Sequence, residues 1–193
     1  MQRICVFCGS RPGKQPGYLK SARVLASELV KRNITLVYGG ASVGIMGEIA
    51  DSVLADNGKV IGIIPKALVD KEVSHNGLTE LIVVKSMHER KSLMAEYSDG
   101  FIALPGGLGT IEELFEVLAW AKLGFHNKPC ALLNIEGYYN DLLLFLDKAI
   151  VDGFINQTDR SLLLVDDNPE TLLDLMASYT PPKIEKLISR DET

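Results

Sequence analysis

A glycine-rich turn between an apolar run and a helical pattern is the feature of this 193-residue chain that most limits its possible folds. The apolar run covers residues 101–104, the turn reads PGGLGT over residues 105–110, and residues 114–122 have the apolar spacing of a helix. A strand that passes through glycines into a helix presents free N–H groups and the positive end of the helix dipole to a ligand. We therefore predict a phosphate-binding turn.

The same turn also fits a purely structural interpretation. Thr110 and Glu113 have the spacing of a capping box, in which a hydroxyl and a carboxylate satisfy free N–H groups at the start of a helix. In the functional interpretation, Glu112 and Glu113 contact a part of the ligand beyond its phosphate, because carboxylates against an anion would repel it. The segment by itself leaves both interpretations open.

Apolar runs followed by small-residue turns and then by helical patterns recur along the chain. Strands are predicted at residues 4–8, 34–38, 59–64, 81–84, 101–104, 131–134 and 162–165. Helices are predicted at residues 18–31, from the 39–47 turn to about residue 57, from residue 86, and at 114–122, 138–151 and 169–179. This alternation predicts an α/β fold with a doubly wound parallel sheet and helices on both faces.

Ligands of such sheets bind at the carboxyl ends of the strands. The glycine turns after the first, second and fifth predicted strands should therefore converge on one site. Residues 65–79 are polar and without regular spacing, and we expect them to form an irregular loop that covers this site.

Length, charge and cysteine content limit the class of protein. We expect one domain over residues 1–180 and a frayed tail over residues 181–193. A net charge of −5 argues against a broad nucleic-acid-binding face, and no apolar run approaches the roughly 20 residues of a membrane helix. The N-terminus passes straight into a strand and lacks a signal-peptide pattern, so we expect a cytoplasmic protein.

The three cysteines are expected to be reduced thiols. Cys5 and Cys8 have C-x-x-C spacing, but in a strand they point to opposite faces, which argues against a shared metal or a disulfide. No other cluster of potential ligands has the spacing of a metal site, and we predict none.

The predicted helix that follows residue 86 carries two cations on one stripe. Met87, Arg90, Lys91 and Met94 fall at i, i+3, i+4 and i+7, on the face that should point inward. Either the two cationic stems cover apolar surface while their heads reach water, or an anion or aromatic ring lies nearby. His126, in a turn after the next helix, is expected to be structural rather than catalytic.

Four segments together resemble the LOG ("lonely guy") family, whose members are cytokinin riboside 5'-monophosphate phosphoribohydrolases once widely labelled possible lysine decarboxylases. The segments are CGS at residues 8–10, the glycine turn at 39–47, MHERK at 87–91 and PGGLGTIEE at 105–113. They occur in the family's order over residues 4 to about 135. The segments MHERK and PGGLGTIEE together are far more specific to the family than a single glycine motif.

The resemblance implies a Rossmann-like α/β fold, usually as a homodimer, that hydrolyses the N-glycosidic bond of adenine nucleoside 5'-monophosphates without a cofactor or a metal. It implies Arg90 and Glu113 as the catalytic pair. The substrate-binding residues that it implies are Ser10, Gly40, Glu72, Arg90, Lys91, Gly107, Leu108, Gly109, Thr110, Ile111, Glu112 and Glu113. The decarboxylase label does not suit the chain, because nothing marks a lysine for a Schiff base with pyridoxal phosphate.

The chemistry of these residues suits the implied reaction. Breaking the C1'–N9 bond develops positive charge on the ribose, so a carboxylate such as Glu113 near C1' stabilises the transition state and orients or deprotonates water. Arg90 contacts the phosphate or polarises the leaving base, and the sequence does not choose between them. The chain departs from many members at Arg11, where a serine is common, and at Ala119, where a hydroxyl residue is common; we expect both positions near the pocket.

Two other functions fit the sequence. One is a non-catalytic nucleotide or cofactor carrier on the same fold, for which the glycine turns would suffice. The other is a hydrolase of other nucleotides, such as pyrimidine monophosphates. The sequence also leaves open whether the substrate is AMP or a prenylated derivative.

Overall fold

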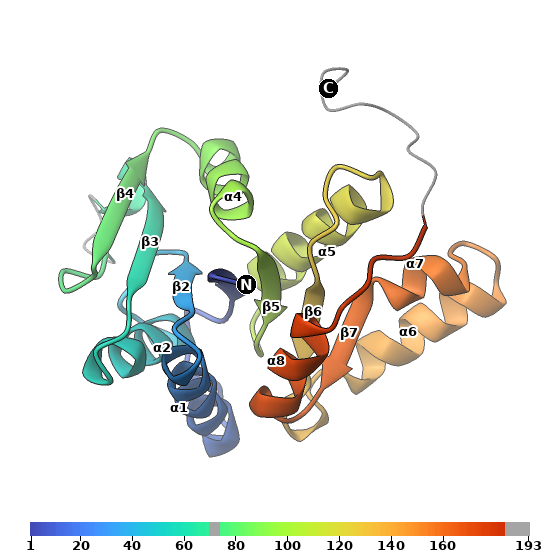
Figure 1. The fold of residues 1–193 in the computed structure, drawn as a ribbon, viewed down its shortest axis with the longest axis horizontal. Coiled ribbons are helices and arrows are strands. Elements are labelled where there is room, and N and C mark those ends of the chain that lie inside the picture. The colour runs from blue at the N-terminus through green and yellow to red at the C-terminus, as the bar shows by residue number, and fades with distance from the viewer. Residues whose placement is uncertain (70–73, 184–193) are drawn as a thin grey trace.

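A computed structural model describes residues 1–69 and 74–183, and it contains a seven-stranded sheet in which every pair of neighbouring strands is parallel (Figure 1). The strands are β1 (Arg3–Phe7), β2 (Thr35–Tyr38), β3 (Val60–Pro65), β4 (Glu80–Val84), β5 (Gly100–Ala103), β6 (Cys130–Leu133) and β7 (Leu163–Asp166). The helices are α1 (Pro16–Lys31), α2 (Gly44–Ala55), α3 (Lys66–Val69), α4 (Met87–Glu96), α5 (Leu108–Lys122), the 3₁₀ turn η1 (Ile135–Gly137), α6 (Asn140–Val151), α7 (Gln157–Ser161) and α8 (Pro169–Ala177).

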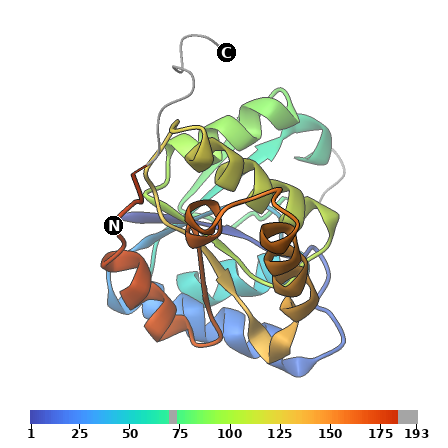
Figure 2. The ribbon, with the colours of Figure 1, turned by 90° about the vertical axis from the view of Figure 1, so that its right-hand side faces the viewer.

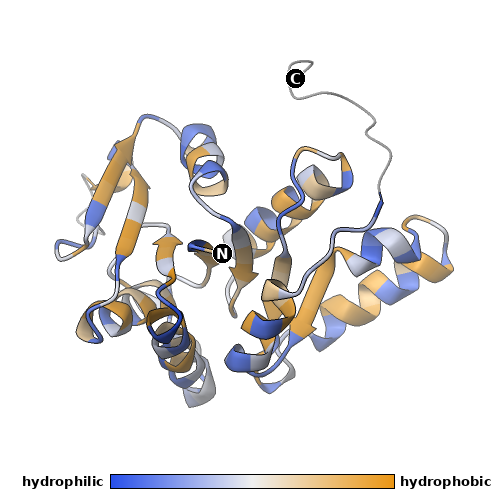
Figure 3. Cartoon of the chain, viewed as in Figure 1, coloured by the Kyte–Doolittle hydropathy of each residue, from blue (hydrophilic) through white to orange (hydrophobic). Residues whose placement is uncertain are grey.

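Helices cover both faces of the sheet, as the alternation predicted. One core cluster packs α1, α2 and α8 against one face, and two others pack α4, α5 and α6 against the opposite face. Figure 2 shows α4 and α5 above the strands, with α1 and α8 below them. Figure 3 shows that the central strands are mostly hydrophobic, which is expected of a parallel sheet buried on both sides. The predicted fold class is confirmed.

The order of the strands, β4-β3-β2-β1-β5-β6-β7, reverses direction beside β1. Strands β2, β3 and β4 follow one another outward on one side of β1, and β5 lies on its other side. Val6 of β1 pairs with Ile102 of β5, and Phe7 pairs with Ala103. The carboxyl ends of β1 and β5 therefore form the switch point at which such sheets bind ligands.

The turns after β1, β2 and β5 meet at this point. The N–H of Gly9 donates to the carbonyl of Pro105 (3.1 Å), and the carbonyl of Gly9 accepts from the N–H of Ile45 (3.0 Å) at the start of α2. The predicted convergence of the three glycine turns is confirmed.

Several local predictions need correction. Helix α5 begins at Leu108, six residues before its predicted start, and its N-cap is Gly107 without a side-chain cap. The capping interpretation of Thr110 is therefore wrong, since this residue already lies inside the helix. The 65–79 segment is not irregular throughout, because residues 66–69 form α3.

Helix α7 was not predicted. This five-residue helix is held by a capping box between Asn156 and Asp159, a short signal without apolar periodicity. At α4, by contrast, the predicted cap is present: the hydroxyl of Ser86 accepts from the N–H of Glu89 (3.1 Å).

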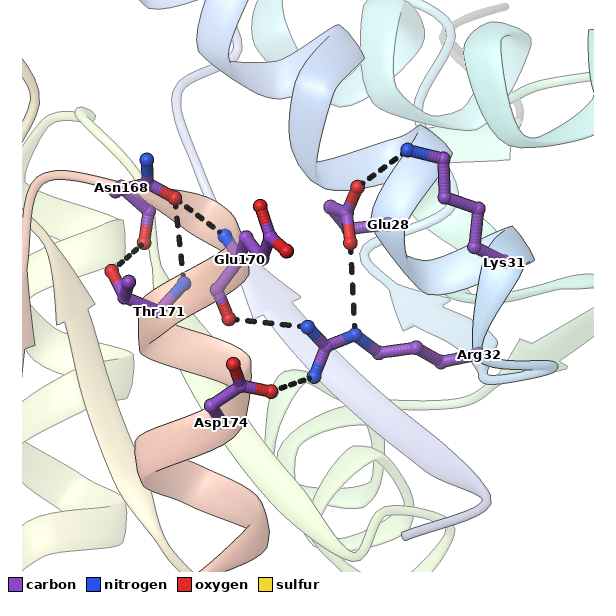
Figure 4. A network of polar contacts seen from close by, with 7 residues as sticks. All are labelled: Glu28, Lys31, Arg32, Asn168, Glu170, Thr171 and Asp174. Atoms are coloured by element: carbon purple, nitrogen blue, oxygen red, sulfur yellow. Dashed lines mark hydrogen bonds and ion pairs between the residues drawn. The ribbon is translucent and has the colours of Figure 1, made fainter.

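A polar network ties the end of α1 to α8, across sequence positions 142 residues apart (Figure 4). The guanidinium of Arg32 donates to Asp174 (2.7 Å) and to the carbonyl of Glu170 (3.2 Å), and it lies 3.7 Å from Glu28. Asn168 caps α8 by accepting from two of its first N–H groups. The last helix is thereby fixed beside the first.

The three cysteines are free thiols, as predicted. Cys5 packs in the core cluster under α4 and α5, whereas Cys8 packs in the cluster under α1 and α2, so they do point to opposite faces. No helix in the described ranges is long and apolar enough to cross a membrane. Residues 181–183 have no regular secondary structure, and the rest of the predicted tail lies outside the described residues.

Candidate active site

A cavity of about 260 Å³ lies at the switch point. It is formed by the turns after β1 and β5 together with the first halves of α4 and α5. Its lining residues are Cys8, Gly9, Ser10, Met46, Met87, Arg90, Gly107, Leu108, Gly109, Thr110, Glu112 and Glu113. Eight of the predicted site residues are thus brought to one cavity.

The two predicted catalytic residues form a buried ion pair. Nη1 of Arg90 lies 3.0 Å from Oε1 of Glu113, and each side chain is only 8% exposed. The Nε of Arg90 also donates to the carbonyl of Ile63 on β3 (3.1 Å). A guanidinium held by two acceptors on different elements has one orientation, and it fixes the carboxylate beside it.

Gly39, at the end of β2, makes room for this guanidinium. A Cβ at Gly39 would lie 2.2 Å from Nη2 of Arg90, well inside van der Waals contact. Without a side chain at Gly39, the arginine lies directly against the backbone of the turn. This glycine belongs to a recognised motif, but its contact with α4 could not be read from the sequence.

Burial raises the pKa of Glu113 above the ordinary glutamate value, although the nearby Arg90 opposes the shift. Desolvation penalises the charged carboxylate more than the nearby cations of Arg90 and Lys91 stabilise it. Glu113 is therefore a carboxylate poised to accept a proton, a property suited to acid–base chemistry.

Lys91 is neutralised by a different pair of carboxylates. Its Nζ lies 2.7 Å from Glu112 and 2.9 Å from Glu116, and these hydrogen bonds raise the pKa of Lys91. Both predicted cations thus have anionic partners, and the alternative in which their heads simply reach water is wrong. Met87 is exposed, however, so the inward stripe of α4 is shorter than predicted.

The start of α5 presents backbone donors to the cavity. The N–H groups of Leu108, Gly109 and Thr110 have no acceptor in the part of the chain that the structure describes, as is usual for a first helical turn. The side chain of Leu108 is 88% exposed, so it is not packed in the core. The open helix start that the sequence predicted is therefore present.

A second hollow, of about 560 Å³, shares part of its lining with the first. Both are lined by Gly9, Ser10, Gly107 and Leu108. The second hollow adds Arg11, Tyr18 and Tyr138 to the site, so Arg11 lies where the sequence analysis expected it.

Four predicted positions lie away from the cavity, and a fifth lies outside the described residues. Lys91 lines a separate hollow, of about 490 Å³, together with His88 and Trp120. Ala119 lines an apolar hollow between α5, α6 and α7, far along α5 from the glycine turn. Ile111 packs in the core beneath α5 and α6. Gly40 is buried, and its carbonyl accepts from the N–H of His75 (2.9 Å) rather than facing the cavity. Glu72 is not among the residues that the structure describes.

Four cavity residues were missed, namely Cys8, Gly9, Met46 and Met87. All four belong to the quoted motifs, which was the signal available in the sequence. His126 has the structural role predicted for it, because its ring contacts the carbonyl of Val117 (2.9 Å) and accepts from the N–H of Lys128. Among the described residues, no cluster of His, Cys, Asp or Glu could hold a metal ion.

A family model described as "Possible lysine decarboxylase" matches residues 46–176. Cytokinin riboside 5'-monophosphate phosphoribohydrolase LOG5 of Arabidopsis thaliana is 52% identical over 180 residues, which cover 93% of this chain and 79% of that protein. LOG1 of the same plant is 49% identical over 98% of this chain and 88% of its own length. The chain belongs to the LOG family. The resemblance inferred from four segments therefore extends over nearly the whole sequence.

More distant solved structures share the fold. A molybdenum cofactor carrier protein from Chlamydomonas reinhardtii matches with a TM-score of 0.71 at 20% identity, over 92% of this chain and 99% of that chain. The molybdenum cofactor binding protein of Rippkaea orientalis matches with a TM-score of 0.70 at 24% identity, over 92% and 96% of the two chains. At such low identity these matches establish the architecture alone.

Proposed function

We propose that this LOG-family protein hydrolyses the N-glycosidic bond of adenine-type nucleoside 5'-monophosphates, cytokinin riboside 5'-monophosphates among them, to a free base and ribose 5-phosphate. The observation that carries the proposal is the buried Arg90–Glu113 pair beside an open helix N-terminus. Its relatives in Arabidopsis thaliana are named for this activity.

The charges in the site favour one orientation of the bound substrate. Glu112, Glu113 and Glu116 outnumber Arg90 and Lys91 near the middle of α5, so a phosphate dianion is repelled there. The free N–H groups at the start of α5 attract it. The 5'-phosphate therefore binds over residues 107–110, and the ribose extends along the helix toward Glu113.

In this orientation Glu113 faces C1' and acts on the reacting atoms. Water adds its oxygen to C1' as the C1'–N9 bond breaks, and one of its protons passes to Glu113. The bond electrons leave with the base, which takes up a proton from solvent, and Glu113 returns its proton to solvent. The ionised carboxylate also stabilises the positive charge that develops on the ribose. Phosphate binding energy holds the sugar in this position.

Arg90 supports the carboxylate in this scheme. Two of its nitrogen atoms are already bound to Glu113 and to the carbonyl of Ile63, which keeps the guanidinium at the ribose end of the cavity. It holds Glu113 in place and lies beside the leaving base. We assign the contact with phosphate to the backbone of α5 instead.

Lysine decarboxylation does not suit this site. A lysine that forms a Schiff base must lose its proton, whereas the two carboxylates beside Lys91 raise its pKa. The lysine is thus kept as a cation.

The test is release of free base from AMP and from isopentenyladenosine monophosphate, followed by chromatography, with Glu113→Gln measured alongside. We expect release by the wild-type protein that falls about a thousandfold in the variant, while nucleotide binding is retained. The ratio of rates would rank the two substrates. UMP and CMP in the same assay test for a pyrimidine hydrolase, and binding without release of any base would favour a carrier.

The protein is proposed to act as a homodimer through the outer face of α4 and α5. A hollow of about 490 Å³ lies on this face, and Trp120 and Phe125 are among its lining residues. Apolar rings in a hollow beside the helices that carry the site suit a two-fold contact next to the pocket. Sedimentation at working concentration should give the mass of a dimer, and a monomer would contradict this proposal.

A further inference from the structure

The turn that precedes α5 is held by hydroxyl groups from a distant segment. Tyr138, which follows η1, donates its hydroxyl to the carbonyl of Gly106 (2.6 Å). Tyr139 donates its hydroxyl to the carbonyl of Leu104 (2.7 Å). Between them, the carbonyl of Pro105 accepts from the N–H of Gly9 (3.1 Å). Three consecutive carbonyl groups of the turn are therefore each bound by a different donor.

The segment that supplies the tyrosines is itself fixed after β6. The side-chain oxygen of Asn134 accepts from the N–H of Tyr139 (2.8 Å), and Glu136 and Gly137 take positive φ angles that bend the chain back over the turn. The rings of Tyr138 and Tyr139 pack edge to face, with centroids 4.8 Å apart. The hydroxyl of Tyr138 is thus aimed by a rigid frame.

The bond from Tyr138 determines the direction of one N–H group in the site. The carbonyl of Gly106 and the N–H of Gly107 belong to the same planar trans peptide, so they point in opposite directions. A donor that holds the carbonyl on one side turns the N–H to the other. Gly107 lines the cavity and precedes the free N–H groups of α5.

We propose that Tyr138 is a positioning residue for the substrate phosphate: by binding the carbonyl of Gly106, it aims the N–H of Gly107 at the 5'-phosphate. This inference rests on the proposed function for the identity of the ligand. It concerns phosphate binding and leaves the chemistry at Glu113 unchanged. Tyr139 has a structural role only. The carbonyl of Leu104 that it binds belongs to the peptide that joins Leu104 to Pro105, and this peptide has no N–H group.

The test is Tyr138→Phe, which removes one oxygen atom from a half-exposed ring. We expect the KM for AMP to rise about tenfold while kcat stays within about twofold, because uniform binding is lost and the transition-state chemistry is not. The dissociation constant of ribose 5-phosphate, measured by calorimetry, should rise by the same factor, and that of adenosine should not change. Tyr97→Phe, at the end of α4, is the matched control and should alter none of these values.

An unchanged KM and an unchanged ribose 5-phosphate affinity would overturn the proposal. So would a fall in kcat at constant KM, since that would place Tyr138 in the chemical step. If the wild-type protein released no base at all, the proposed function would fail, but the effect on ribose 5-phosphate binding would still decide the role of Tyr138.

Discussion

Two ion pairs between the same two helices have opposite environments. Arg90 and Glu113 are 8% exposed on both sides, whereas their chain neighbours Lys91 and Glu112 are 14% and 55% exposed. The inner pair is desolvated, so the pKa of its carboxylate is raised. The outer pair is solvated on one side and adds a second carboxylate, Glu116. Residues of the same charge, one position apart, thus differ in burial and in their charged partners.

The largest difference between the pairs should appear on removal of one carboxylate charge. Glu113→Gln should lower kcat by about a thousandfold, since a general base and its charge are both lost. The matched variant Glu112→Gln should keep kcat within about threefold, because solvent and Glu116 replace its charge beside Lys91. Base release from AMP measures both. Equal losses in the two variants would remove the distinction between the pairs.

A substitution at Gly39 tests whether turnover depends on the position of the Arg90–Glu113 pair. Gly39→Ala puts a Cβ where the guanidinium of Arg90 lies, so the pair must shift. A displacement of this kind should reduce kcat by about 100-fold. Gly77→Ala, whose Cβ would meet only the ring of His75 at 3.3 Å, is the control. Normal turnover in Gly39→Ala would show that the orientation of Arg90 does not matter.

The raised pKa of Glu113 predicts two opposite pH effects. Turnover requires the ionised carboxylate, so kcat should fall as pH drops through a value above the ordinary glutamate pKa of about 4.3. The free energy of unfolding should instead increase as pH drops, because Glu113 holds its proton more tightly in the folded state than in the unfolded state. The stability contributed by Glu113 is fully present below the ordinary pKa and is lost as pH rises through the raised folded pKa.

Denaturation of wild-type and Glu113→Gln protein across this pH range isolates the stability effect. The difference in unfolding free energy, wild type minus variant, should decrease with rising pH. A difference that increases would mean that Arg90 outweighs burial and lowers the pKa of Glu113.

The smallest effect is expected at the outer pair. Glu116→Gln removes one of the two partners of Lys91 and should lower the free energy of unfolding by about 0.5 kcal/mol, as for other partly solvated ion pairs. Urea denaturation at low and high salt should show that this difference is screened. A loss several times larger would indicate that the outer pair is as desolvated as the inner one.

Residue patterns predicted every strand of the sheet and the residue types of the candidate catalytic pair, whereas the short helices α3 and α7 were not predicted. Strand and helix periodicities are local, so the parallel α/β order followed from them, and the motifs that contain Arg90 and Glu113 identified the family before any contact was known. The glycine turn at residues 105–109 predicted an anion site because backbone donors at a helix start depend only on neighbouring residues.

Which charges are buried, and what orients the site, depends on contacts between segments that are distant in the sequence. Arg90 and Glu113 are 23 residues apart, and the hydroxyl of Tyr138 reaches the carbonyl of Gly106 across 32 residues. The early start of α5 at Leu108 and the position of Ala119 away from the cavity were likewise absent from any local pattern. Which groups are desolvated and which groups touch depends on which helices and strands pack together. Such packing joins residues too far apart in the sequence for a local pattern to reveal it.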